Sequence, residues 1–133
     1  MSLSDAQSIP PLPSLKPNIN SNLNIETLPL MTLAELAIPE DGYEFGPRIL
    51  VVLKGLVFDV TRSQELFGPA GLFKAYPTKD ITYALAKGST LEADTQVIGT
   101  LGLTRREKEN LERWFIMFKN RFEVIGRTEQ FNR

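Results

Sequence analysis

The chain has 133 residues, 42% of them hydrophobic, so it can bury one core of ordinary size and should form one domain with appendages. Its 15 basic and 16 acidic side chains give a net charge of −1, which provides no electrostatic attraction for nucleic acid. The lack of cysteine and histidine excludes disulfides, iron–sulfur clusters, thiolate or imidazole metal sites, Ser-His-Asp catalysis and bis-histidine haem.

Residues 1–29 are predicted to form an extended, proline-rich arm. Five of the nine prolines lie there among serines and asparagines, a composition that does not favour regular structure. The arm is either a disordered leader or a strap on a protein partner, with side chains such as Ile9 and Leu12 as anchors. It lacks the features of a secretory signal, and the longest apolar run, Ile49 to Leu53, is far shorter than the roughly 20 residues that span a bilayer. We expect an intracellular protein without a transmembrane segment of its own.

The folded domain is predicted over residues 30–128. Its first element is a short helix from Thr32 to about Ala37, because Thr32 and Glu35 have the spacing of a capping box. Two β-rich runs follow, Ile49 to Leu53 and Leu56 to Val60. The intervening Lys54-Gly55 has the glycine that a two-residue hairpin turn needs, so the two runs should pair as a hairpin.

The region after the hairpin is predicted to contain short helices. They are expected over Ser63 to Phe67, Gly71 to Tyr76, and Asp80 to Ala86, with Asp80 as the N-cap of the last. Asp59 closes the hairpin, where its side chain should bond to the backbone rather than take part in chemistry.

The longest helix is predicted from Thr104 to about Arg121. Thr104 and Glu107 form a second capping box, and apolar residues follow at helical spacing. A last strand should run from Phe122 to Ile125, followed by a C-terminal tail over residues 129–133. The sequence contains no phosphate-binding loop, metal-ligand spacing or activated nucleophile, so we expect no enzymatic activity.

Four runs together resemble one known family. They are Ile49 to Thr61, Leu66 to Gly71, Lys79 to Ala86, and Val124 to Arg127. The ordered series resembles the cytochrome b5-like heme/steroid-binding domains of the membrane-associated progesterone receptor type, over about Thr27 to Thr128. The resemblance implies an α+β fold in which short helices form a pocket over a small mixed sheet.

Members of that family bind haem through an axial tyrosine, whereas related members bind none or act through protein contacts. They are also described as stabilising partner haem enzymes and as sterol-linked regulators. This chain departs from the family pattern in the pocket. Phe67 stands for the tyrosine before the Gly-Pro turn, Phe73 for the ligating tyrosine, and Arg121-Phe122 for a Lys-Tyr pair. Phenylalanine keeps the ring but has no oxygen for iron or for a hydrogen bond.

The remaining donors near the pocket by this resemblance are the Tyr76 and Tyr83 hydroxyls, with Met31 and Met117 as sulfur alternatives. The structural alternative for Tyr76 is a half-buried ring with its hydroxyl at the surface, and for Met117 a place in the core.

The sequence therefore leaves two hypotheses. In the first, the domain has lost haem ligation, carries no cofactor, and is a non-catalytic accessory subunit of a larger assembly, which a partner could attach to a membrane. In the second, it is a carrier or regulator that binds haem or a sterol through a non-standard ligand such as Tyr76 or Tyr83.

Overall fold

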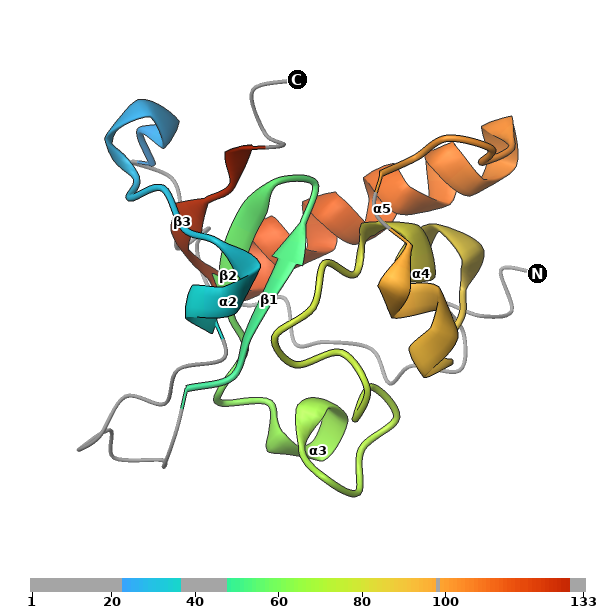
Figure 1. Cartoon of the computed structure of the whole chain (residues 1–133), viewed down its shortest axis with the longest axis horizontal. Coiled ribbons are helices and arrows are strands. Elements are labelled where there is room, and N and C mark those ends of the chain that lie inside the picture. The colour runs from blue at the N-terminus through green and yellow to red at the C-terminus, as the bar shows by residue number, and fades with distance from the viewer. Residues whose placement is uncertain (1–22, 37–47, 98, 130–133) are drawn as a thin grey trace.

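The computed structural model describes residues 23–36, 48–97 and 99–129. In chain order its elements are η1 (Ile25–Thr27), α2 (Leu33–Leu36), β1 (Leu50–Leu53), β2 (Leu56–Asp59), α3 (Gln64–Phe67), α4 (Thr82–Lys87), η2 (Glu92–Gln96), α5 (Arg105–Arg121) and β3 (Glu123–Arg127). Figure 1 shows α2 on one side of the sheet and α5 on the other.

The strands form an antiparallel sheet in the order β1-β2-β3. The predicted hairpin is confirmed, with Leu53 paired to Leu56 next to the turn. Lys54 and Gly55 both have positive φ, 51° and 82°, as a tight turn between right-twisted strands requires. β2 is irregular between Val57 and Phe58, where its register with β3 shifts.

Both outer edges of the sheet are bonded to other segments. Val52 in β1 exchanges backbone hydrogen bonds of 2.9 and 2.8 Å with residues 79–81. Arg127 in β3 does the same with residues 29–31, at 2.7 and 2.9 Å. Both bridges are parallel but isolated, so the sheet itself is antiparallel rather than mixed as predicted.

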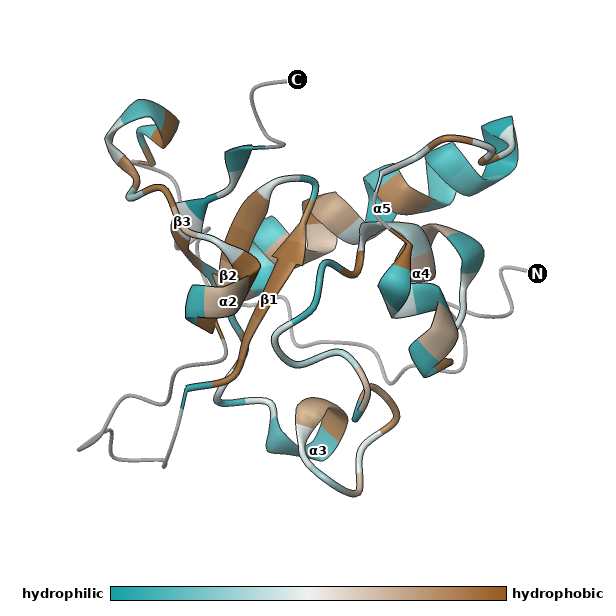
Figure 2. Cartoon of the chain, viewed as in Figure 1, coloured by the Kyte–Doolittle hydropathy of each residue, from teal (hydrophilic) through white to brown (hydrophobic). Residues whose placement is uncertain are grey.

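The two faces of the sheet bury clusters of different size. The smaller cluster contains Leu36 of α2, Leu50, Val52 and Val57. The larger one lies on the face covered by α5, and Figure 2 shows β1 and β2 hydrophobic along their length. The N-terminal turns of α5, by contrast, extend away from the sheet and are hydrophilic.

Both predicted capping boxes are confirmed. The Thr32 amide donates to the Glu35 carboxylate and the Glu35 amide to the Thr32 hydroxyl, and Thr104 and Glu107 make the same reciprocal pair. α5 buries Leu111, which lies three residues before Trp114 and seven before Phe118.

Three local predictions are wrong. Residues 71–76 form turns rather than a helix, because the Phe73 amide donates back to the Leu66 carbonyl at 2.8 Å. Ile81, not Asp80, is the N-cap of α4, because Asp80 is engaged in the bridge to Val52. Met117 is 36% exposed, outside the buried stripe of α5.

Most of the predicted arm, residues 1–22, lies outside the described residues, as do residues 130–133 of the tail. The rest of the arm includes η1, and Leu23, Ile25 and Leu28 pack against the larger cluster. Within the described part of the chain, none of the helices combines the length and hydrophobicity that a membrane crossing requires.

Candidate functional site

Four of the six predicted pocket positions meet in a group of six rings, which we call the aromatic cluster. None of its side chains is more than 6% exposed. They come from α3, the 71–76 turns, α5 and the residue that joins α5 to β3. The members are Phe67, Phe73, Tyr76, Trp114, Phe118 and Phe122.

The three phenylalanines expected at the pocket are brought together around Phe67. The centre of its ring lies 5.4 Å from that of Phe73 and 6.1 Å from that of Phe122. Phe73 stacks on Tyr76, with 4.7 Å between ring centres and 5° between planes. These separations are those of aromatic pairs in contact, so the rings pack directly against one another.

A close backbone approach puts Phe73 into the cluster. A Cβ on Gly71 would overlap the Leu66 carbonyl, so only glycine lets the chain turn back there. The turn brings the Phe73 amide onto the same carbonyl and sets its ring against Phe67. Gly71 therefore serves backbone geometry.

The Tyr76 hydroxyl is buried and hydrogen-bonded. The side chain is 1% exposed, and the hydroxyl donates to the Ser89 carbonyl at 2.5 Å, so the expectation of a half-buried ring with a surface hydroxyl is wrong. Burial, with a smaller effect of Asp94, raises the pKa of this phenol well above its ordinary value. A phenol held protonated on a carbonyl is not free to bind iron as a phenolate.

The two other predicted site residues lie at the margin of the aromatic cluster. Tyr83 of α4 is half-buried against the larger cluster, with the Lys87 ammonium 5.6 Å from its ring centre. Arg121 is half-buried at the last position of α5, beside Phe122. Among the described residues, no group of acidic side chains is placed to hold a metal ion.

Trp114 was not among the predicted site residues. It is 4% exposed, and its ring lies edge-on to Phe73, with 6.2 Å between centres and 79° between planes. Its indole N–H is buried without a hydrogen-bond partner in the described part of the chain. At helical spacing a tryptophan is typical of a core position, and no sequence signal reveals whether its nitrogen is paired.

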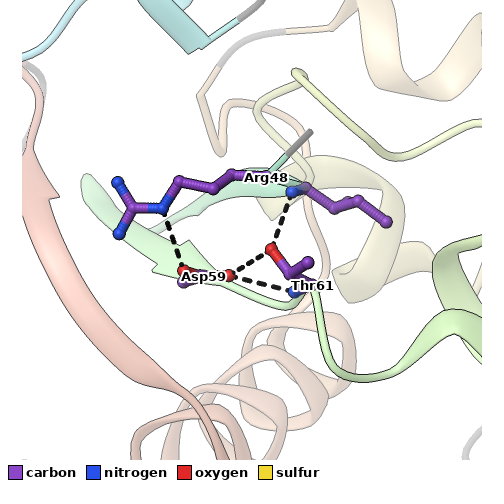
Figure 3. Close-up of polar contacts among 4 residues, drawn as sticks. Arg48, Asp59 and Thr61 are labelled. Carbon is purple, nitrogen blue, oxygen red and sulfur yellow. Dashed lines mark hydrogen bonds and ion pairs between the residues drawn. The ribbon is translucent and has the colours of Figure 1, made fainter. Parts of the chain in front are cut away.

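Asp59 fastens the end of the hairpin, as predicted (Figure 3). One carboxylate oxygen accepts from the Thr61 amide at 3.0 Å and hydroxyl at 2.5 Å, and the other lies 3.3 Å from Arg48 Nε. The Thr61 hydroxyl oxygen in turn accepts from the Ile49 amide at 2.9 Å. We call Asp59, Thr61 and this amide the Asp59 clamp. It fixes the chain just before α3, which carries Phe67.

The same pattern recurs at the hairpin turn. The Asp80 carboxylate accepts from the Thr82 amide at 3.1 Å and hydroxyl at 2.7 Å, and the Thr82 hydroxyl oxygen accepts from the Lys54 amide at 2.9 Å. We call this the Asp80 clamp. Burial raises the pKa of Asp80, and the bonds from Thr82 only partly oppose that shift.

No protein-family model matches the chain. Over 94 residues it is 34% identical to "Probable steroid-binding protein 3" of Arabidopsis thaliana, a match covering 71% of this chain and 93% of the relative. Over 108 residues it is 30% identical to membrane-associated progesterone receptor component 2 of Rattus norvegicus, covering 76% of this chain and 49% of the relative. The match thus spans about half the length of the rat protein.

Two solved structures from Arabidopsis are similar. One, of a protein with a cytochrome b5-like fold, has a TM-score of 0.62 at 33% identity and covers 76% of this chain and 91% of its own. The other is the solution structure of a candidate steroid-binding protein, with a TM-score of 0.63 at 33% identity, covering 76% and 97%. The predicted cytochrome b5-like fold is confirmed.

Proposed function

Because the chain belongs to the cytochrome b5-like steroid-binding proteins that include the membrane-associated progesterone receptor components, we propose that it is a non-catalytic member that holds no haem and serves a protein partner as an accessory subunit. The observation that carries this proposal is the aromatic cluster. By the family resemblance, Phe67, Phe73 and Phe122 stand where tyrosines are expected, and phenylalanine offers no atom to iron.

The other candidate ligands do not fit haem either. The Tyr76 hydroxyl is bonded to Ser89, and Tyr83 packs at the margin of the core. Met31 packs against the smaller cluster on the other face of the sheet, and Met117 is 36% exposed. The cluster keeps the apolar rings of a ligand pocket without a group that would bind an iron atom.

The loss of haem is tested by titrating purified protein with hemin and recording the Soret band. We expect no saturable band for the wild type, and a band for the triple variant Phe67→Tyr, Phe73→Tyr, Phe122→Tyr, which restores the hydroxyls. A stoichiometric Soret complex of the wild type would overturn the proposal. In that case Tyr76→Phe and Tyr83→Phe would identify the ligand.

Exposed apolar side chains beyond α4 support the accessory role. Leu91 is 66% exposed and Leu101 is 96% exposed, in the stretch that leads to α5. Scattered single apolar side chains are normal on a surface, but two exposed leucines in one connecting stretch suit contact with a partner.

The accessory role is tested by the size of the native complex of the tagged full chain at its natural expression level. We expect elution well above the 14.9 kDa of the monomer, and a shift toward the monomer for Leu91→Ser with Leu101→Ser. Ile116→Ser on α5, where the side chain is 55% exposed, is the matched control. A monomer that is unaffected by deletion of residues 1–22 and by the leucine changes would contradict the accessory role.

A second candidate function is the binding of a sterol-type molecule. It is favoured by the names of the relatives, which are steroid-binding proteins, and by the apolar character of the cluster. Trp114 is the chain's single tryptophan, so its emission reports on the cluster directly. We expect progesterone to change that emission saturably, and the absence of any saturable change would remove this candidate.

A further inference from the structure

We infer that the thioether of Met31 is a site of reversible oxidation, and that its sulfoxide releases residues 29–31, which we call the edge strap, from β3. Met31 packs against the smaller cluster, on the face of the sheet away from the aromatic cluster. Oxidation at this site is therefore independent of both functions proposed above.

The edge strap is held to β3 by two hydrogen bonds and one side-chain contact. The Met31 amide donates to the Arg127 carbonyl at 2.7 Å, and the Arg127 amide donates to the Pro29 carbonyl at 2.9 Å. The Met31 side chain lies directly on Gly126, where an added Cβ would overlap the sulfur and stand 3.0 Å from Cγ. The sulfur thus occupies the space that the missing side chain of Gly126 leaves open.

Met31 is the apolar anchor of the edge strap. The segments on either side have anchors of their own, because Leu28 packs against the larger cluster and Leu36 is buried in the smaller one. Within the strap, Pro29 is exposed and Leu30 is 50% exposed. Of the three strap side chains, Met31 alone packs against a buried cluster. Without that contact, only the two hydrogen bonds to Arg127 hold the strap.

The chemistry of the site is the oxidation of a thioether by hydrogen peroxide. The chain has three methionines and no cysteine, so no thiol competes for the oxidant. Met31 is half-buried, which leaves its side chain partly open to solvent. A sulfur lone pair attacks one peroxide oxygen, and the S–O bond forms as the O–O bond breaks. The departing hydroxide takes the proton of the transferred oxygen and becomes water, so sulfur loses two electrons and peroxide gains them.

Oxidation changes the polarity of the anchor. A sulfoxide is polar and carries an additional oxygen, whereas the smaller cluster consists of leucine and valine side chains, which offer that oxygen no hydrogen-bond donor. The sulfoxide is therefore more stable in water than against Gly126, and the edge strap should open. Methionine sulfoxide reductases remove the oxygen, so the change is reversible.

The direct test measures hydrogen exchange of the amides at positions 31 and 127 by NMR. Met117→Leu leaves Met31 open to oxidation, and Met31→Leu leaves Met117, which is 36% exposed on α5, as the matched control. After peroxide treatment, with the sulfoxides verified by mass spectrometry, both amides of Met117→Leu should exchange about tenfold faster, the effect of losing one half-buried apolar contact. Methionine sulfoxide reductase should restore the original rates, and Met31→Leu should keep its rates throughout.

A second test needs no oxidant. Gly126 is not among the glycines with positive φ, so its backbone accepts alanine, whose Cβ would displace the Met31 sulfur. We expect Gly126→Ala to exchange the same two amides faster while its far-UV circular dichroism stays that of the wild type.

Three results would overturn the inference. The first is unchanged exchange at both amides after complete oxidation of Met31. The second is equal acceleration in peroxide-treated Met31→Leu, which would assign the effect to another residue. The third is unchanged exchange in folded Gly126→Ala, which would show that the sulfur contact does not hold the edge strap.

Discussion

Strand β1 is fastened at its two ends by clamps of the same sequence pattern that differ in their surroundings. In both, an aspartate accepts from the amide and hydroxyl of a threonine two residues later, and that hydroxyl oxygen accepts from a backbone amide at one end of β1. Asp59 also pairs with Arg48, whereas Asp80 is 5% exposed and forms no ion pair with any described residue.

The Asp-x-Thr pattern determines the hydrogen bonds of each clamp but not the cost of ionising its carboxyl. The pattern sets the hydrogen bonds, which are the same at both ends, because they depend on residues two apart in the chain. Burial and charged neighbours set the cost of ionising the carboxyl, and these come from the tertiary structure. The Asp80 clamp should therefore respond to pH in a way that its hydrogen bonds alone would not predict.

The largest loss of unfolding free energy is expected when both clamps lose their threonine hydroxyls. Thr61→Val and Thr82→Val each leave a backbone amide without its acceptor, which costs about 1–3 kcal/mol of unfolding free energy. The two sites lie at opposite ends of a strand, so the double variant should lose roughly the sum, about 2–6 kcal/mol. Urea unfolding of the four proteins measures this. A marked departure from additivity would mean that the clamps are coupled through β1.

Removal of one carboxylate should have the next largest effect. Asp59→Ala takes the acceptor from the Thr61 amide and hydroxyl, and we expect a loss of about 1–3 kcal/mol in urea unfolding. Asp59→Asn keeps one acceptor oxygen and should lose clearly less. Equal losses in the two variants would show that the charge, not the hydrogen bonding, stabilises this end.

The Asp80 clamp should give a pH dependence of definite sign. Its folded-state pKa is raised above the ordinary 3.8, so its contribution to stability is fully present below that pH and is lost as pH rises through the folded pKa. The unfolding free energy of the wild type relative to Asp80→Asn should therefore fall across this range. Urea unfolding of both proteins at a series of pH values tests it, and a difference independent of pH would contradict the burial argument.

The smallest effect is expected from the one ion pair that distinguishes the clamps. Arg48 and Asp59 side chains are 23% and 9% exposed, and a pair near the surface contributes about 0.2–1 kcal/mol. Arg48→Gln should cost about that much in urea unfolding, and less at high salt, because ions screen the attraction. A larger loss that salt does not change would assign another role to Arg48.

The features that the sequence predicts correctly depend on residues close together in the chain. The Lys54-Gly55 turn, the capping box at Thr104 and the bonding of Asp59 to the backbone all follow from local spacing. The family resemblance also predicts contacts between distant residues, which local spacing cannot. Phe67 and Phe122 lie far apart in sequence and meet in the structure.

The incorrect predictions concern features that depend on residues far apart in the chain. Asp80 is not an N-cap because it forms a bridge with Val52, far away in the chain. Tyr76 is fully buried because its hydroxyl meets the Ser89 carbonyl, which no local pattern indicates. The unpaired nitrogen of Trp114 likewise depends on which atoms surround it, and it becomes visible only in three dimensions.

The segments paired along both sides of the sheet limit how other chains can join it. An open strand edge invites a foreign strand to extend the sheet, as in strand-addition complexes and amyloid. Here residues 79–81 bridge to Val52 of β1, and residues 29–31 bridge to Arg127 at the end of β3. A partner should therefore dock on side chains. Removal of residues 1–22 should leave the protein soluble, whereas removal of residues 1–31 should expose the edge of β3 and cause self-association.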